Sequence, residues 1–239
     1  MSDPSVPRRA MVIVAHPDDA EYTMAGTVAA WSRQGAAVAY VICTRGDCGS
    51  NDPKVTPWEL ARIREAEQRA AAAIVGVQEV TILGHPDGTL EPTLALRRDL
   101  TRQIRRFRPD VVLTGDPTVR FYGDYYLNHP DHRAAASAAL DAVFPSAETR
   151  YIFPELLAEG LEPHRVRAVY IHGSPEPNVW VDISEVLELK IRALQAHKSQ
   201  VDPEGAAEWV RAMALERGRP KDMQAAEAYR RILVHWDEQ

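Results

Sequence analysis

The sequence has few cysteines, no excess of basic residues and no long hydrophobic run, and each absence excludes a class of protein. Cys43 and Cys48 are the only cysteines among 239 residues, so a disulfide framework is excluded and a reducing compartment is indicated. Lys and Arg number 28 against 34 Asp and Glu, and this net charge of −6 argues against a nucleic-acid partner. No apolar run approaches the roughly 20 residues of a membrane span. The first apolar run, Met11–Ala15, is also too short for the core of a signal peptide. We therefore expect a cytoplasmic protein with no membrane span.

Short apolar runs alternate with helical patterns as far as His172, which predicts a parallel β-sheet covered by helices. Strands are expected at Met11–Ala15, Ala37–Cys43, Val80–Leu83, Asp110–Thr114 and Val166–His172, and Asn178–Ile183 is a candidate for a sixth. Helices are expected at Ala20–Gln34, Pro57–Val75, Leu94–Phe107, His132–Val143, Glu185–Ala196, Glu204–Glu216 and Met223–Ile232. The clearest helix start has Thr56 as N-cap, Pro57 after it and Glu59 completing a capping box.

These elements predict one α/β domain over residues 1–239. We expect a Rossmann-like three-layer sandwich, with helices on both faces of a mostly parallel sheet in the order 3-2-1-4-5. The core would span about residues 10–200. A C-terminal helical extension, about residues 201–239, would pack back on that core.

Two His-Pro-Asp segments follow the first and fourth expected strands, one as HPDD and one as HPDH. In a sheet of the expected order, ligands bind between strands 1 and 4, beyond their carboxyl ends. Imidazole and carboxylate together are ligands for a catalytic Zn²⁺. His16, Asp19 and His132 are the candidate metal ligands, and Asp18 and His129 are left for proton transfer.

A third such segment, His85-Pro86-Asp87, shows that a single copy indicates no more than a turn, so the argument depends on the pair. The first βα loop has one late glycine, Gly26, and not the G-x-G-x-x-G of a dinucleotide site. The P-loop pattern and the G-x-S-x-G of serine hydrolases are also absent from the sequence.

The AHPDDAE and HPDH segments resemble those of the PIG-L/LmbE-like N-deacetylases. Further stretches also look like blocks of this family, namely TRGDCGS, IREAEQRAAAAIVGV, GHPDGTL and LKIRALQAHKSQ, so the resemblance extends from about Met11 to Gln200. The resemblance implies a zinc-dependent hydrolase that removes acetyl from an N-acetylglucosamine-type sugar, with Fe²⁺, Co²⁺ or Mn²⁺ as other metals for the same ligands. The tail is most similar to the chitobiose-deacetylase-like and bacillithiol-type branches. Relatives are often trimers or hexamers, so a homo-oligomer is expected.

By position, the resemblance implies zinc ligands at His16, Asp19 and His132. It implies that Asp18 is the general base, that His129 polarises or protonates the reacting group, and that Asp131 orients His129. Either Asp18 or His129 would protonate the leaving amine.

The resemblance also implies that Arg64 and Asp87 contact the sugar. Arg45 is expected to point into the crevice, as a substrate or a scaffold contact. Some members of the family have a tyrosine where this chain has Leu127, so the role of the nearby Tyr125 and Tyr126 is open.

Other assignments stay open at this point. His197 and Gln200 in the HKSQ segment either support the site from behind or end a helix, and Trp180 or Trp209 could line a sugar subsite. The alternative function is a zinc amidohydrolase that deacylates a non-sugar amide. A metal-binding module or a phosphoesterase on the same sheet is a third reading, although a phosphoesterase would usually need a second metal.

Overall fold

The computed structural model describes residues 6–235, so residues 1–5 and 236–239, at the ends of the expected 1–239 domain, lie outside the described range. Within that range, the centre is a seven-stranded sheet in the order β3-β2-β1-β4-β7-β9-β8. Its strands are β1 (Arg9–Val14), β2 (Ala37–Thr44), β3 (Glu79–His85), β4 (Val111–Gly115), β7 (Ala168–His172), β8 (Val179–Asp182) and β9 (Ala226–Leu233). A separate hairpin is formed by β5 (Phe121–Tyr122) and β6 (Tyr126–Leu127).

The five strands from β3 to β7 pair in parallel. Because β7 is the fifth strand of the expected set, the expected order 3-2-1-4-5 is confirmed for this part of the sheet. The strand β1 is buried on both faces: Ala10, Val12 and Val14 pack into one core cluster, and Met11 and Ile13 into the other. A continuous apolar run is typical of a strand in this position.

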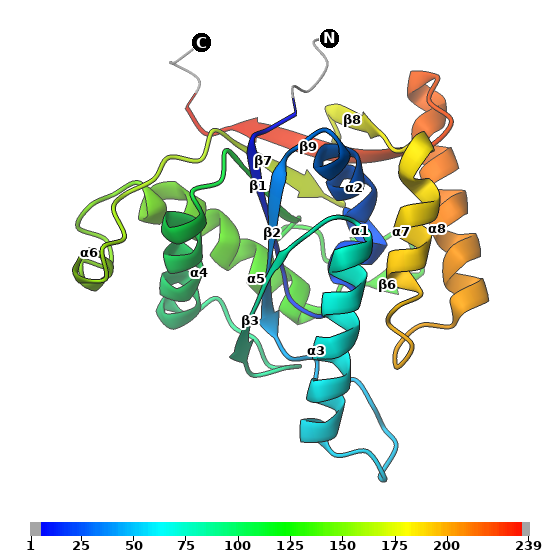
Figure 1. Cartoon of the computed structure of the whole chain (residues 1–239), viewed down its shortest axis with the longest axis horizontal. Helices are drawn as coiled ribbons and strands as arrows, with labels where there is room; N and C mark the ends of the chain where they lie inside the picture. The colour runs from blue at the N-terminus through cyan, green and yellow to red at the C-terminus, as the bar shows by residue number, and fades with distance from the viewer. Residues whose placement is uncertain (1–5, 236–239) are drawn as a thin grey trace.

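Helices cover both faces of the sheet (Figure 1). One face carries α1 (Asp19–Thr23), α2 (Ala25–Arg33), α3 (Pro57–Ile74), α7 (Leu187–Leu194) and α8 (Pro203–Gly218), and the other carries α4 (Leu94–Phe107) and α5 (Pro130–Asp141). A short α6 (Glu155–Ala158) follows α5 in the chain. The capping box of α3 is present, with Thr56 and Glu59 each bonded to the backbone of the other. The three-layer sandwich is therefore confirmed.

The single helix expected over Ala20–Gln34 is wrong, because the chain leaves helical geometry at Met24, which has φ −129° and ψ −6°. Because of the break, backbone N–H groups at the start of α2 have no hydrogen-bond partner in a preceding helical turn. A carboxylate from β9 accepts two of them: Glu227 lies 3.0 Å from the nitrogen of Gly26 and 2.7 Å from that of Thr27. A distant buried residue thus replaces the local cap that the sequence lacks.

The helix expected over Met223–Ile232 is also wrong. Most of this segment belongs to the strand β9, which lies antiparallel between β7 and β8 in the order of the sheet. The first half of β9, Ala226–Tyr229, pairs with β8 and is buried, and the second half, Tyr229–Leu233, pairs with β7. The C-terminal extension is therefore one helix, α8, followed by an interior strand of the sheet.

Among residues 6–235, no helix combines the length and the apolar character that crossing a bilayer requires.

Candidate metal centre and catalytic residues

The two His-Pro-Asp segments meet at the carboxyl end of the neighbouring strands β1 and β4. The HPDD segment forms the turn between β1 and α1, and HPDH begins α5. His129 is the N-cap of α5, where its Nδ1 accepts from the backbone N–H of Asp131 at 3.2 Å. The meeting point is the one that the expected strand order indicated.

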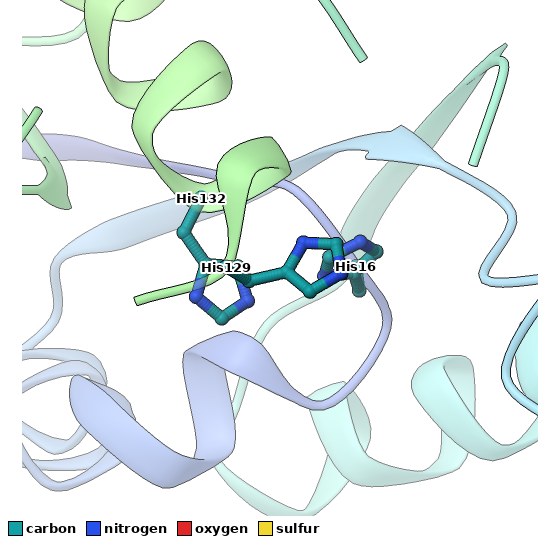
Figure 2. A group of neighbouring side chains, drawn as sticks. All are labelled: His16, His129 and His132. Carbon is teal, nitrogen blue, oxygen red and sulfur yellow. The ribbon is translucent and has the colours of Figure 1, made fainter. Parts of the chain in front are cut away.

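Three imidazole rings gather there, those of His16, His129 and His132 (Figure 2). Their ring centres lie 5.0 to 5.3 Å apart, and one nitrogen of each lies within 4.8 Å of the others. Asp19 bridges two of the rings: Oδ2 lies 3.5 Å from Nδ1 of His16, and Oδ1 lies 3.0 Å from Nε2 of His132. The structure therefore brings the expected ligands His16, Asp19 and His132 together.

His16 is surrounded by carboxylates. Its Nε2 lies 3.1 Å from Oδ1 of Asp87 and 3.3 Å from Oδ2 of Asp131, while Asp19 faces Nδ1. Burial alone would lower the pKa of His16, but the charge of Asp19 and hydrogen bonds to the three carboxylates raise it to about 12. Such a concentration of negative charge favours a cation. Nitrogen and carboxylate donors are also the set that Zn²⁺ takes in catalytic sites, so these residues fit a divalent metal.

The ring of His132 is oriented by Asn128, a residue that sequence reasoning missed. Nδ1 of His132 lies 3.2 Å from Oδ1 of Asn128, which is buried and donates its amide to the carbonyl of Val119 at 2.8 Å. Because the amide oxygen only accepts, Nδ1 of His132 carries the hydrogen and Nε2 is left to face Asp19. The one signal in the sequence was the position of Asn128, one helical turn before His132.

Asp18 stands apart from this ligand set. Its carboxylate accepts from Nη2 of Arg64 at 3.1 Å, and its backbone N–H donates to Oε1 of Gln68 at 3.1 Å. Burial and the charge of Asp19 raise the pKa of Asp18 to about 7, although Arg64 opposes this shift. A carboxyl group with a pKa near neutrality can both accept and return a proton.

Arg64 was expected to contact the sugar, but in the structure its side chain is buried and bonds to other groups of the protein. It is 4% exposed, and it donates to the carbonyls of Gly46 and Pro17 as well as to Asp18. The structure thus adds a supporting role toward Asp18, and contact with a sugar stays a prediction.

Asp87 and Asp131 are held by backbone groups. Asp87 accepts from the N–H of Cys48 at 2.7 Å, and Asp131 accepts from those of Gly88 at 2.7 Å and Leu90 at 3.2 Å. The carboxylate of Asp131 lies 3.8 Å from Nδ1 of His129, which is beyond hydrogen-bond distance. The backbone of Asp131 therefore orients His129, and its carboxylate faces His16.

Further sequence candidates, those after β2 and in the β5–β6 hairpin, are exposed. Arg45 is exposed and is available to a ligand. Tyr125 is 85% exposed and Leu127 is 67% exposed. Tyr126 is nearer to the site: burial and the charge of Asp19 raise its pKa. Of the two tyrosines whose role was open, Tyr126 is the one that the charge of the site reaches.

Comparison with known families gives this geometry a context. The family model described as PIG-L, GlcNAc-PI de-N-acetylase, matches residues 11–143, more than half of the chain. The chain belongs to the PIG-L family. The resemblance found in the HPDD and HPDH segments is therefore confirmed.

Individual relatives extend the similarity beyond that range. Diacetylchitobiose deacetylase of Thermococcus kodakarensis is 34% identical over 227 residues, which cover 93% of this chain and 82% of that protein. The 1D-myo-inositol 2-acetamido-2-deoxy-alpha-D-glucopyranoside deacetylase of Saccharomonospora viridis is 31% identical over 80% of this chain and 84% of its own length. The structure of N,N'-diacetylchitobiose deacetylase from Pyrococcus horikoshii has a TM-score of 0.87 and 30% identity, covering 95% of this chain and 84% of that one.

Proposed function

We propose that this protein is a metal-dependent N-deacetylase that hydrolyses the acetamide of an N-acetylglucosamine-type sugar or glycoside and releases acetate. The observation that carries the proposal is that two adjacent aspartates in one turn are suited to two different functions. Asp19 faces His16 and His132 as a metal ligand would, while the adjacent Asp18 is turned away toward Arg64 and is free to move a proton. A protein that only binds a metal has no need of the second carboxylate.

His16, Asp19 and His132 would hold the metal. When bound there, Zn²⁺ polarises the acetyl carbonyl as a Lewis acid and lowers the pKa of the attacking water toward about 7. Fe²⁺, Co²⁺ and Mn²⁺ are compatible with the same donors, so metal analysis of the protein is the way to identify the ion that it binds in the cell.

In this proposal, Asp18 is the residue that transfers the proton. It takes a proton from the water as the water attacks the acetyl carbon, and it returns a proton to the departing amine. The carboxyl pKa of about 7 suits both steps, and burial is its first cause.

We assign to His129 the stabilisation of the developing negative charge. Because its Nδ1 accepts the backbone N–H of Asp131, its Nε2 carries the hydrogen and can donate it to the carbonyl oxygen. A donor aimed at such an oxyanion contributes roughly 3–4 kcal/mol to lowering the barrier.

The relatives that bear names such as diacetylchitobiose deacetylase support an amino-sugar substrate, and the exposed Arg45 after β2 is a candidate contact for it. We also propose a reducing compartment, since both cysteines are free thiols in the described residues. A homo-oligomer, a trimer or a hexamer, stays a prediction that light scattering would test.

The test is acetate release by the zinc-loaded protein from N-acetylglucosamine, diacetylchitobiose, and the inositol and malate glycosides of N-acetylglucosamine, with acetanilide beside them. We expect release from at least one sugar and its loss on chelation. Asp18→Asn should lower kcat by roughly 10²–10⁴-fold while one metal ion stays bound per chain. Asp52→Asn, an exposed carboxylate, is the matched control and should behave as the parent does. Release from acetanilide alone would favour the non-sugar amidohydrolase, and retained activity in Asp18→Asn would contradict the mechanism.

A further inference from the structure

We propose that Glu21, Gln68 and His197 form a buried positioning unit that holds Asp18 in its working conformation, so that these residues set kcat without touching the substrate. The inference rests on the proposed function, in which Asp18 moves the proton. It gives a role to the HKSQ segment, which the metal centre leaves unused.

The three side chains form a continuous chain of hydrogen bonds that ends on Asp18. Gln68 accepts the backbone N–H of Asp18 at 3.1 Å and donates its amide to Oε1 of Glu21 at 3.1 Å. Nε2 of His197 lies 3.2 Å from the other oxygen of Glu21. Glu21, Gln68 and His197 are each 0% exposed, and they come from α1, α3 and the turn after α7. Three separate elements therefore meet behind one catalytic residue.

The direction of each bond is fixed by chemistry. A carboxylate only accepts hydrogen bonds, so Glu21 requires the NH₂ group of Gln68 and the N–H of His197. Gln68 must then turn its oxygen toward Asp18, which is the orientation that the backbone N–H needs. Nδ1 of His197 is buried without a hydrogen-bond partner in the described structure, so the hydrogen bond that the ring makes there is the one to Glu21. Glu21 thus sets the direction of the whole unit.

Asp18 needs such support because of its backbone. It has φ 99° and ψ −28°, a left-handed conformation that non-glycine residues rarely adopt and that persists only when the surroundings impose it. Arg64 holds the side chain through Oδ2 at 3.1 Å, and Gln68 holds the backbone N–H. Because Gln68 is uncharged and binds the main chain, it fixes the position of Asp18 and leaves the carboxylate free for proton transfer.

A purely structural role predicts a different outcome, since buried polar groups also serve stability. Glu67 makes the distinction possible. It lies on α3 beside Gln68 and anchors the same turn after α7, accepting from the backbone N–H of Ser199 at 2.9 Å and from its hydroxyl at 2.7 Å. It makes no contact with Asp18 in the described contacts, so a variant at Glu67 removes an anchor of the turn without removing any hydrogen bond of the positioning unit.

The decisive experiment compares Gln68→Met with Glu67→Ala in the zinc-loaded full-length protein. Gln68→Met keeps the side-chain length and removes both hydrogen bonds. We expect kcat to fall by roughly 10²-fold, the effect of a displacement of about 1 Å, with KM and metal content unchanged. Glu67→Ala should lower the melting temperature and leave kcat within about twofold of the parent. A kcat for Gln68→Met within twofold of the parent, or an equal loss in Glu67→Ala, would overturn the proposal.

A second pair of variants serves if Gln68→Met does not fold. The amide introduced by Glu21→Gln can still accept from Gln68 and donate to His197 in its other tautomer, so this variant should recover most of the activity that Glu21→Leu loses. Equal kcat values in the two would overturn the proposal.

Crystal structures separate this inference from the proposed function. If the parent enzyme deacetylates none of the sugars, the function fails, but the backbone of Asp18 still reports on positioning. A φ of Asp18 that leaves the positive region in Gln68→Met supports the unit, and an unchanged φ overturns it.

Discussion

Arg64 and Asp18 form a largely buried ion pair, with Nη2 of the guanidinium 3.1 Å from Oδ2 of the carboxylate. The same Nη2 also donates to the carbonyl of Pro17, so one group holds both the side chain of Asp18 and the peptide before it. This fork of donors belongs to arginine, and an ammonium group does not reproduce its geometry.

Arg64→Lys should therefore lower kcat more than it raises KM. We expect roughly a 10²-fold loss of kcat, because the substitution displaces Asp18 and alters no exposed side chain. Steady-state kinetics on the preferred sugar provides the measurement. Arg62→Lys, an exposed residue of the same helix, is the control. A rise in KM with unchanged kcat would instead support the sugar contact that the sequence resemblance implied.

Asn128→Ala should weaken metal binding without removing a ligand. Asn128 orients His132 through Nδ1, and loss of such a partner typically costs 10- to 100-fold in metal affinity. Competition with a chromophoric chelator measures the dissociation constant for Zn²⁺. Asn178→Ala, which removes an amide bonded to Arg231 in the strand pair β8–β9, is a control far along the sheet. Equal affinity in the two variants would contradict the role given to Asn128.

Trp209→Ala should affect long substrates more than short ones. Trp209 is 49% exposed and packs edge-on against Tyr22, with ring centres 5.8 Å apart. Burial and the charge of Asp18 raise the pKa of Tyr22, so this aromatic pair lies beside the catalytic turn. Trp180, the other candidate from the sequence, instead lies on β8 under the ammonium group of Lys221.

We expect Trp209→Ala to raise KM for diacetylchitobiose about tenfold, since an aromatic stacking contact is worth about 0.5–1.5 kcal/mol beyond the area that it buries. KM for N-acetylglucosamine should stay the same, as should both values in Trp180→Ala. Equal increases for the two sugars in Trp209→Ala would show that the ring does not contact a second sugar.

The parallel half of the sheet could be predicted because its signals are local. Each of its strands is a short apolar run, and the loops after strands 1 and 4 carry the HPDD and HPDH segments. A sequence pattern therefore locates His16, Asp19 and His132 without any knowledge of packing.

The rest depends on partners that are distant in sequence. The strand β9 forms because β8 pairs with its first half and β7 with its second, and the break at Met24 is stabilised by Glu227. Gln68 and Asn128 are ordinary polar residues until the fold places them behind Asp18 and His132. No local pattern distinguishes such residues from those on a solvent-exposed face.

The buried pair of Lys190 and Glu227 should be strongly coupled. Both side chains are nearly inaccessible, and Glu227 also accepts from Gly26, Thr27 and Tyr229. Burial would raise the pKa of Glu227, but the charge of Lys190 and the hydrogen bonds from Lys190 and Thr27 lower it, so the carboxylate is charged.

Glu227→Gln alone should cost about 3–5 kcal/mol in the free energy of unfolding, because it leaves the ammonium group of Lys190 unpaired in the core. The double variant with Lys190→Met should cost less than the sum of the two single variants. Urea denaturation of the four proteins gives the coupling energy. Additive losses would show that the hydrogen bonds to α2, and not the charge pair, stabilise this region.

The stability of the metal-free protein should fall below about pH 6.5 because of His172. Burial lowers the pKa of His172 well below its ordinary value, and the positive charges of Arg217 and Lys190 add to this, while Asp19 opposes it. Nη1 of Arg217 lies 3.0 Å from Nε2 of His172, so the ring accepts that hydrogen bond only in its neutral form. Below the pKa that His172 has in the unfolded chain, the unfolded state therefore binds a proton at this residue and the native state does not.

The direction in which the free energy of unfolding changes with pH follows from that difference in bound protons. The free energy of unfolding is highest above pH 6.5 and decreases as the pH falls toward the native pKa, by at most about 1.4 kcal/mol per pH unit for one group. The side-chain oxygen of His172→Gln can still accept from Arg217 but does not titrate, so this contribution should disappear. Urea denaturation from pH 7.5 to 5.5 in the presence of chelator measures both proteins. All other titrating groups are common to the two and cancel in the difference, so parallel curves would assign the acid sensitivity to residues other than His172.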